Sequence, residues 1–330
     1  KNGLSKKWHF LAVLYALFGV LTVFGTGNAT QVNTIVSSIH SALHNLHIID
    51  GTVDERANLI FGIFIAAFVA MVLLGGIQRI GQVSEKLVPF MAALYVILAI
   101  GVVILHISRV PAVFAMIFKS AFTPQAATGG IIGSMFLSMK KGVSRGIFSN
   151  EAGLGSAPIA AAAAQTKEPV RQGLVSMTGT FIDTIVICTL TGLSIVLTGA
   201  WQVPGLEGVD VTTYAFQKGL PFPPEVSAFV LMLCLVFFAF TTILGWDYYS
   251  ERCLEYLSGG NIKHVKIFRW IYILAVFIGP YMTVSAVWTI ADIFNGLMAI
   301  PNMIAIFALS GVVAKETRDF FQRHKEGKIK

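Results

Sequence analysis

A polar segment with spaced glycines interrupts one of the apolar stretches of this sequence, Asn150-Glu151-Ala152-Gly153-Leu154-Gly155-Ser156-Ala157-Pro158. The hydrocarbon of a bilayer offers no partners to peptide N–H and C=O groups, so non-helical chain at that depth must line a cavity or bind something. Broken membrane helices of this kind mark substrate and ion sites. We therefore expect residues 149–156 to leave the helix and to form a binding site.

Glu151 carries the charge of this segment. A carboxylate in a bilayer costs a few kcal/mol on insertion scales, so it must face a partner or water. It either coordinates an ion, carries a proton or forms an ion pair, or it is a structural carboxylate bonded to freed backbone N–H groups. Ser149 and Asn150 are better candidates for direct contact, because neutral polar groups can bind a zwitterion without a charge penalty.

Two hydroxyls, Thr241 and Thr242, lie in the middle of the apolar stretch 224–257. They either bond back to carbonyls of their own helix or supply oxygen ligands to a small hard cation such as sodium. Trp246 follows Thr242 by one turn, so the two share a face. This indole either floors a pocket or packs against neighbouring helices.

Asn28 and Gln31 follow a Gly-Thr-Gly sequence in the first apolar stretch and share one helix face. They either bind a solute or hydrogen-bond between helices. Three further acids, Asp183, Asp247 and Asp292, could each pair with a basic residue on a neighbouring helix.

Composition bounds the class of protein. Of the 330 residues, 55% are hydrophobic and 12% are charged, whereas a soluble domain carries about 25% charged residues. The mean hydropathy is +0.74. The fold class is therefore an all-α polytopic membrane protein. The sequence has no nucleotide-binding glycine loop, metal-ligand cluster or Ser/His/Asp set, so we expect neither an enzyme nor a cofactor. The net charge of +7 is spread between apolar stretches, which argues against nucleic acid as a partner.

About eight spans can be predicted from the apolar runs, near residues 8–45, 56–75, 87–107, 131–165 (interrupted), 172–198, 224–257, 267–284 and 285–315. Asn295-Gly296 and Pro301-Asn302 predict a kink or a short first helix in the last of them. With the N-terminus in the cytoplasm, 17 of the 24 Lys and Arg residues lie on the inner side and four on the outer side. This bias predicts that both ends of the chain are cytoplasmic. We expect a membrane core over 1–314 and a basic cytoplasmic tail over 315–330.

The segment Gly146-Ile147-Phe148-Ser149-Asn150-Glu151-Ala152-Gly153-Leu154-Gly155-Ser156-Ala157-Pro158 resembles the signature of the alanine/glycine:cation symporter family (sodium:alanine symporters). The likeness extends over nearly the whole chain. Further similar blocks are Phe24-Gly25-Thr26-Gly27-Asn28, Leu87-Val88-Pro89-Phe90-Met91, Phe181-Ile182-Asp183-Thr184, Phe238-Ala239-Phe240-Thr241-Thr242-Ile243-Leu244-Gly245-Trp246 and Asn295-Gly296-Leu297-Met298-Ala299-Ile300-Pro301-Asn302.

The resemblance implies a LeuT-type inverted-repeat transporter fold, in which the eight spans match core helices three to ten. The family carries two further core helices ahead of this region, so we expect the chain to be N-terminally truncated. The implied substrate-binding residues are Asn28, Gln31, Phe148, Ser149, Asn150, Glu151, Gly153, Thr242 and Trp246. Thr241 and Thr242 are the implied ligands of sodium, the coupling ion.

The expected function is sodium-coupled symport of small neutral amino acids, alanine or glycine, across the plasma (inner) membrane by alternating access. Phe148, Thr242 and Trp246 are expected to form a wall that limits the substrate side chain to a hydrogen or a methyl group. A proton-coupled symporter, a channel and a non-transporting membrane fragment or scaffold are the alternatives. The sequence does not decide between alanine and glycine, L and D forms, sodium and proton coupling, or oligomeric states.

Overall fold

The computed structural model describes residues 3–49, 55–122 and 131–329. In these ranges the chain is helical, without a strand. The first half contains α1 (His9–Thr22), η2 (Val23–Ala29), α2 (Thr30–Asn45), α3 (Glu55–Leu73), α4 (Gly76–Leu105), α5 (Val110–Phe122) and α6 (Ile131–Asn150). The second half contains α7 (Ala157–Ala161), α8 (Pro169–Phe181), η4 (Ile182–Ile187), α9 (Cys188–Thr198), α10 (Val209–Gly219), α11 (Pro224–Leu257), α12 (Ile262–Ile278) and α13 (Val284–Lys325). Short 3₁₀ turns connect some of them: η1 (Lys6–Trp8), η3 (Ile107–Arg109), η5 (Ala200–Gln202) and η6 (Gly279–Tyr281).

Six of the described helical segments are long and apolar enough to cross a bilayer. They are Lys6–Asn45, Glu55–Leu73, Gly76–Leu105, Pro169–Thr198, Pro224–Leu257 and Val284–Lys325. α6 carries three basic residues and α12 has 17 residues, so neither is among the six. The polytopic helical class is confirmed, whereas the count of eight spans and the LeuT-type arrangement stay predictions.

Two segments adopt a π-helical turn inside an otherwise continuous helix. η2 joins α1 to α2, and η4 joins α8 to α9. Such turns are rare and occur mostly at functional sites. In η2 the side chain of Thr30 donates to the carbonyls of Gly25 and Thr26, and its backbone N–H also donates to the Gly25 carbonyl.

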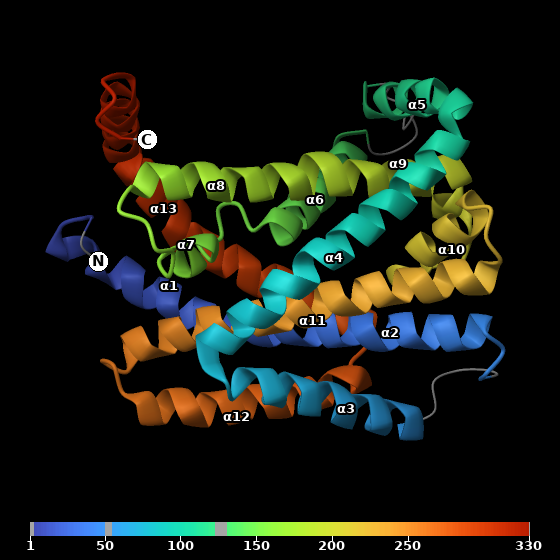
Figure 1. Cartoon of the computed structure of the whole chain (residues 1–330), viewed down its shortest axis with the longest axis horizontal. Helices are drawn as coiled ribbons and strands as arrows, with labels where there is room; N and C mark the ends of the chain where they lie inside the picture. Colours follow the sequence, from blue (N-terminus) through green and yellow to red (C-terminus); the bar gives the residue numbers. More distant parts are fainter. Residues whose placement is uncertain (1–2, 50–54, 123–130, 330) are drawn as a thin grey trace.

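The hydrophobic core lies where η2, α2, α3, α11 and α12 meet. Its largest buried side chains include Trp246, Tyr272 and Leu73. Figure 1 shows α11 and α2 side by side across the centre, with α3 and α12 paired below them. Gly27 allows η2 and α11 to lie close together, because a Cβ at this position would lie 2.2 Å from Cβ of Trp246.

α13 is one helix from Val284 to Lys325, so of the two predicted alternatives the short first helix is wrong, whereas the kink stays a prediction. Pro301 lies inside it and is buried. A proline is tolerated in a membrane helix where neighbouring groups compensate the freed backbone. The helix also passes residue 315 without a break. The division into a core and a tail at that point stays a prediction.

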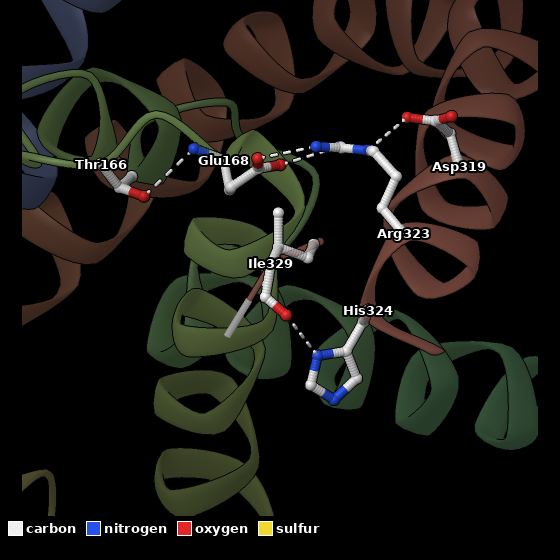
Figure 2. A network of polar contacts seen from close by, with 6 residues as sticks. All are labelled: Thr166, Glu168, Asp319, Arg323, His324 and Ile329. Carbon is white, nitrogen blue, oxygen red and sulfur yellow. Dashed lines mark hydrogen bonds and ion pairs between the residues drawn. The ribbon is translucent and has the colours of Figure 1, made fainter. Parts of the chain in front are cut away.

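The far end of α13 is tied to the loop that precedes α8 (Figure 2). The Arg323 guanidinium donates two hydrogen bonds to Glu168, at 2.8 and 2.9 Å, and a third to Asp319 at 2.8 Å. In Figure 1, α13 ends at the same end of the bundle at which α1 begins.

Candidate functional site

The interruption predicted from the sequence is present in the structure. α6 ends at Asn150 and α7 begins at Ala157. Between them the backbone takes positive φ at Glu151 (55°), Gly153 (89°) and Gly155 (82°). That region suits glycine and is uncommon for other residues. The break is thus confirmed over 151–156, whereas Ser149 and Asn150 still belong to the helix.

Neighbouring helices fix the geometry of this break. The Asn302 side-chain amide of α13 donates to the Gly153 carbonyl at 2.9 Å. A Cβ on Gly155 would lie 2.7 Å from the Asn302 side chain and 2.9 Å from the Tyr15 ring. Leu154 is fully buried in the core. Neighbouring helices therefore hold the break in its conformation, and only glycine fits at position 155.

The Glu151 carboxylate is satisfied by side chains. It accepts a short hydrogen bond from the Ser156 hydroxyl and another from Trp246. Tyr15 and Tyr249 lie near enough to interact with it electrostatically. No basic side chain pairs with Glu151 in the ranges that the structure covers. The side-chain partners differ from both the predicted ion pair and the predicted bonding to backbone N–H groups.

Ser149 and Asn150 face η4. The Ser149 hydroxyl donates to the Asp183 carboxylate at 2.8 Å, and the Asn150 amide donates to the Thr184 hydroxyl at 2.9 Å. The Asn150 side-chain oxygen accepts from the backbone N–H of Ala152 at 2.9 Å. Both predicted contact residues thus have protein partners, and those partners lie on a π-helical turn.

Phe148 packs against α13. The centroid of its ring lies 4.6 Å from that of Trp288. The Arg145 guanidinium carbon, Cζ, lies 4.1 Å from the Trp288 ring centroid. Arg145 also forms an ion pair with Asp292, as predicted for that acid. Trp246, in contrast, packs against Tyr249 at 5.6 Å. The expected wall is therefore divided between two groups with different neighbours.

Asn28 is fully buried on η2. Its amide donates to the Tyr272 carbonyl of α12 at 3.1 Å, while its side-chain oxygen is buried without a hydrogen-bond partner. The Gln31 amide instead donates to the Thr26 carbonyl at 3.0 Å. The interhelical role weighed for Asn28 is therefore present, and it leaves one acceptor unused.

A cavity of about 420 Å³ adjoins the break. It lies between α1, α7, α11 and α13, and its lining includes Tyr15, Gly155, Pro158, Cys253 and Asn302. The Tyr15 hydroxyl is buried without a hydrogen-bond partner. A mostly apolar space with an unsatisfied hydroxyl beside unwound peptide is suited to a small solute.

Comparison with known proteins identifies the group to which this sequence belongs. The profile of the "Sodium:alanine symporter family" matches residues 1–330. This chain belongs to the sodium:alanine symporter family. The family consists of transporters rather than enzymes, and the apolar helices agree with a multi-pass membrane protein.

Individual relatives in this family have different names. An "Uncharacterized transporter" of Haemophilus influenzae is 49% identical over 98% of this chain and 68% of its own length. The "Sodium/alanine symporter AgcS" of Methanococcus maripaludis is 43% identical over 98% of this chain and 67% of its own length. The "Probable sodium/glutamine symporter GlnT" of Bacillus subtilis is 36% identical over 99% and 64%. The chain thus spans about two thirds of the length of these relatives.

The threonines suggested as sodium ligands in this symporter family member bond to their own helix. Thr241 donates to the carbonyls of Phe237 and Phe238 at 3.0 Å each, and Thr242 donates to that of Phe238 at 2.9 Å. A hydroxyl has two lone pairs in addition to its proton. Back-bonding uses the proton and leaves the oxygens able to coordinate a cation.

The sequence analysis of this family member did not identify Tyr15, and it used Asn302 only as a signal for a change in the last helix. Tyr15 is a single hydroxyl in an apolar run, and nothing in its spacing marks it. Asn302 had a signal, since it follows a proline in mid-helix, but that signal predicted a change of helix direction rather than a partner for Gly153.

Proposed function

We propose that the protein is a secondary active symporter that moves a small neutral amino acid together with sodium by alternating access. The observation that carries the proposal is the break at 151–156, which stands against the buried core and beside the cavity. We place it in the plasma (inner) membrane, with both ends of this chain in the cytoplasm and a LeuT-type arrangement of helices.

Neutral polar groups suit a zwitterionic solute. The unpartnered Asn28 oxygen is an acceptor for an ammonium group. The peptide N–H groups of Glu151, Ala152 and Leu154 already donate within the chain, and the others of the break are donors for a carboxylate. Thr241 and Thr242 supply hydroxyl oxygens for sodium. Sodium then couples to the solute because both bind one conformation better than the other.

Alanine and glycine are the first candidate substrates. The name of the Methanococcus relative points to alanine, whereas the name of the Bacillus relative points to glutamine. The close approach of Gly27 to Trp246 favours a small side chain, because it brings η2 and α11 together.

The test is uptake of labelled alanine into proteoliposomes, in sodium and in choline medium. We expect saturable uptake that requires sodium, and lower uptake that needs a higher sodium concentration in Thr241→Ala and Thr242→Ala. Thr289→Ala is the matched control, because this hydroxyl also bonds back to its own helix, at Ser285 on an exposed face of α13. Equal uptake in both media would favour protons, non-saturable flux a channel, and no uptake a scaffold.

Substrate size is tested separately with Trp246→Ala. We expect the variant to accept larger amino acids, with Trp270→Ala, at an exposed position of α12, as the aromatic control. An unchanged substrate profile in Trp246→Ala would contradict a role of the indole in selecting small solutes.

A further inference from the structure

Asp247 is an anomaly in the core of the protein. It follows Trp246 on α11 and is 1% exposed. One of its carboxylate oxygens, Oδ1, is buried without a hydrogen-bond partner. Buried polar groups are nearly always hydrogen-bonded, and a buried charge requires a partner of opposite sign. An ionised Asp247 would meet neither condition, because its Oδ1 has no hydrogen-bond partner and its charge has no partner of opposite sign.

The cation that acts on Asp247 is already engaged. Arg269 of α12 binds Glu251 through two parallel hydrogen bonds, Nε to Oε1 at 2.6 Å and Nη2 to Oε2 at 2.9 Å. Glu251 and Arg269 are the charged groups that act on Asp247. With all three ionised, this buried cluster carries one uncompensated negative charge.

Other groups around Asp247 do not cancel this charge. Tyr272 of α12 interacts with it, but the Tyr272 hydroxyl lies 2.9 Å from the Gly27 carbonyl and 2.8 Å from that of Ile243, to which it donates. η2, which packs against the same helix, presents the neutral Asn28. The missing positive charge must therefore be a bound cation or a proton.

A proton fits this position better than a metal ion. A hard cation takes several oxygen ligands, while each Glu251 oxygen already accepts a hydrogen bond from Arg269. Among the residues that the structure describes, no three His, Cys, Asp or Glu side chains are grouped to hold a metal ion. A proton requires one free carboxylate oxygen, which Asp247 has.

We propose that Asp247 is a proton-binding site and is protonated in the conformation described above. Its role in coupling rests on the proposed symport function. Tyr272 links it to the candidate solute site, because its hydroxyl contacts the Gly27 carbonyl and its own carbonyl accepts from Asn28. The proton binds Asp247 when the site is closed and leaves to water when the site opens.

The first experiment does not depend on transport. Infrared spectra of the purified protein are recorded at neutral pH, and the carbonyl band of a protonated carboxylic acid is compared between variants. We expect Asp247→Asn to lose a band that Asp292→Asn keeps, since Asp292 is paired with Arg145. Asp247→Glu is the control for misfolding, because it keeps a carboxyl group at this position, and it should shift the band without removing it. Equal spectra for the wild type and Asp247→Asn would overturn the proposal, as would loss of the wild-type band on adding sodium at constant pH.

The second experiment measures alanine uptake from mildly acidic to mildly alkaline pH. We expect wild-type uptake to change with pH, and Asp247→Asn uptake to be independent of pH while it still requires sodium. An unaltered pH profile in Asp247→Asn would overturn the coupling role. If the wild type moves no amino acid, the symport proposal fails, while the infrared result still decides whether Asp247 binds a proton.

Discussion

Two polar networks in this protein use the same types of residue in different surroundings. The core network joins Glu251 to Arg269, whose side chains are 5% and 19% exposed. The α6 network joins Arg145 to Asp292, which are 36% and 34% exposed. It also includes the hydrogen bonds from the end of α6 to η4.

The surroundings decide how strongly each network holds the fold. An exposed ion pair contributes about 0–1 kcal/mol, whereas breaking a buried one costs about 3–5 kcal/mol because a charge is left unpaired. The core network therefore fixes α11 to α12, and the α6 network can be separated and re-formed at low cost. This difference suits a molecule in which a broken helix moves against a rigid scaffold.

The largest effect is expected from breaking the core network. Arg269→Ala leaves Glu251 buried beside Asp247 without a cation, so we expect the free energy of unfolding to fall by about 3–5 kcal/mol. Thermal unfolding in detergent measures it. The control is Arg252→Ala, which removes a half-exposed partner of Glu255 on the same helix. Similar losses in both variants would contradict the comparison.

A change at the break itself should have an intermediate effect. Gly155→Ala forces a side chain into positive φ and against Asn302 and Tyr15, at a cost of about 1–3 kcal/mol. Gly142→Ala on α6 is the control, because nothing lies within 4 Å of a Cβ there, and a helical alanine stabilises by about 0.5–1 kcal/mol. The same thermal assay measures both. A neutral Gly155→Ala would mean that the break is not held by its neighbours.

A small effect on stability is expected from the α6 network. Asp292→Asn should lower the free energy of unfolding by less than about 1 kcal/mol. Since Asp292 holds Arg145 over Trp288 beside Phe148, the same variant should change the rate of alanine uptake. Unfolding and uptake are measured on one preparation. A loss of stability as large as that of Arg269→Ala would show that this network is structural.

The smallest effect concerns the surface contact in Figure 2. The Arg323 guanidinium holds the pKa of Glu168 below its usual range. The folded pKa thus lies below the unfolded one, so the contribution is complete above the unfolded pKa and is lost as pH falls through the folded pKa. Glu168→Gln should therefore reduce the melting temperature slightly at neutral pH and not in strong acid. Glu316→Gln, at an exposed site on α13, should show no such pH-dependent difference.

The sequence predicts the long helices and the break, and these depend on local chemistry. Apolar runs set the spans, and Gly153 and Gly155 mark the positions at which the chain leaves the regular helix. The choice of partners depends on tertiary distances. Asp247 and Glu251 are four residues apart and so share a helix face, which allows either one to bind Arg269. The sequence shows the competition between them, and the packing of α12 decides it.

The widened turn of η2 has a mechanical consequence. It holds one residue more than the α-helical turns on either side, and each residue of an α-helix turns the chain by about 100°. If this extra residue moved along the helix past Asn28, that side chain would rotate by about the same angle, away from Tyr272. The helix would stay intact, and the buried Asn28 amide would move from one face of the helix to another.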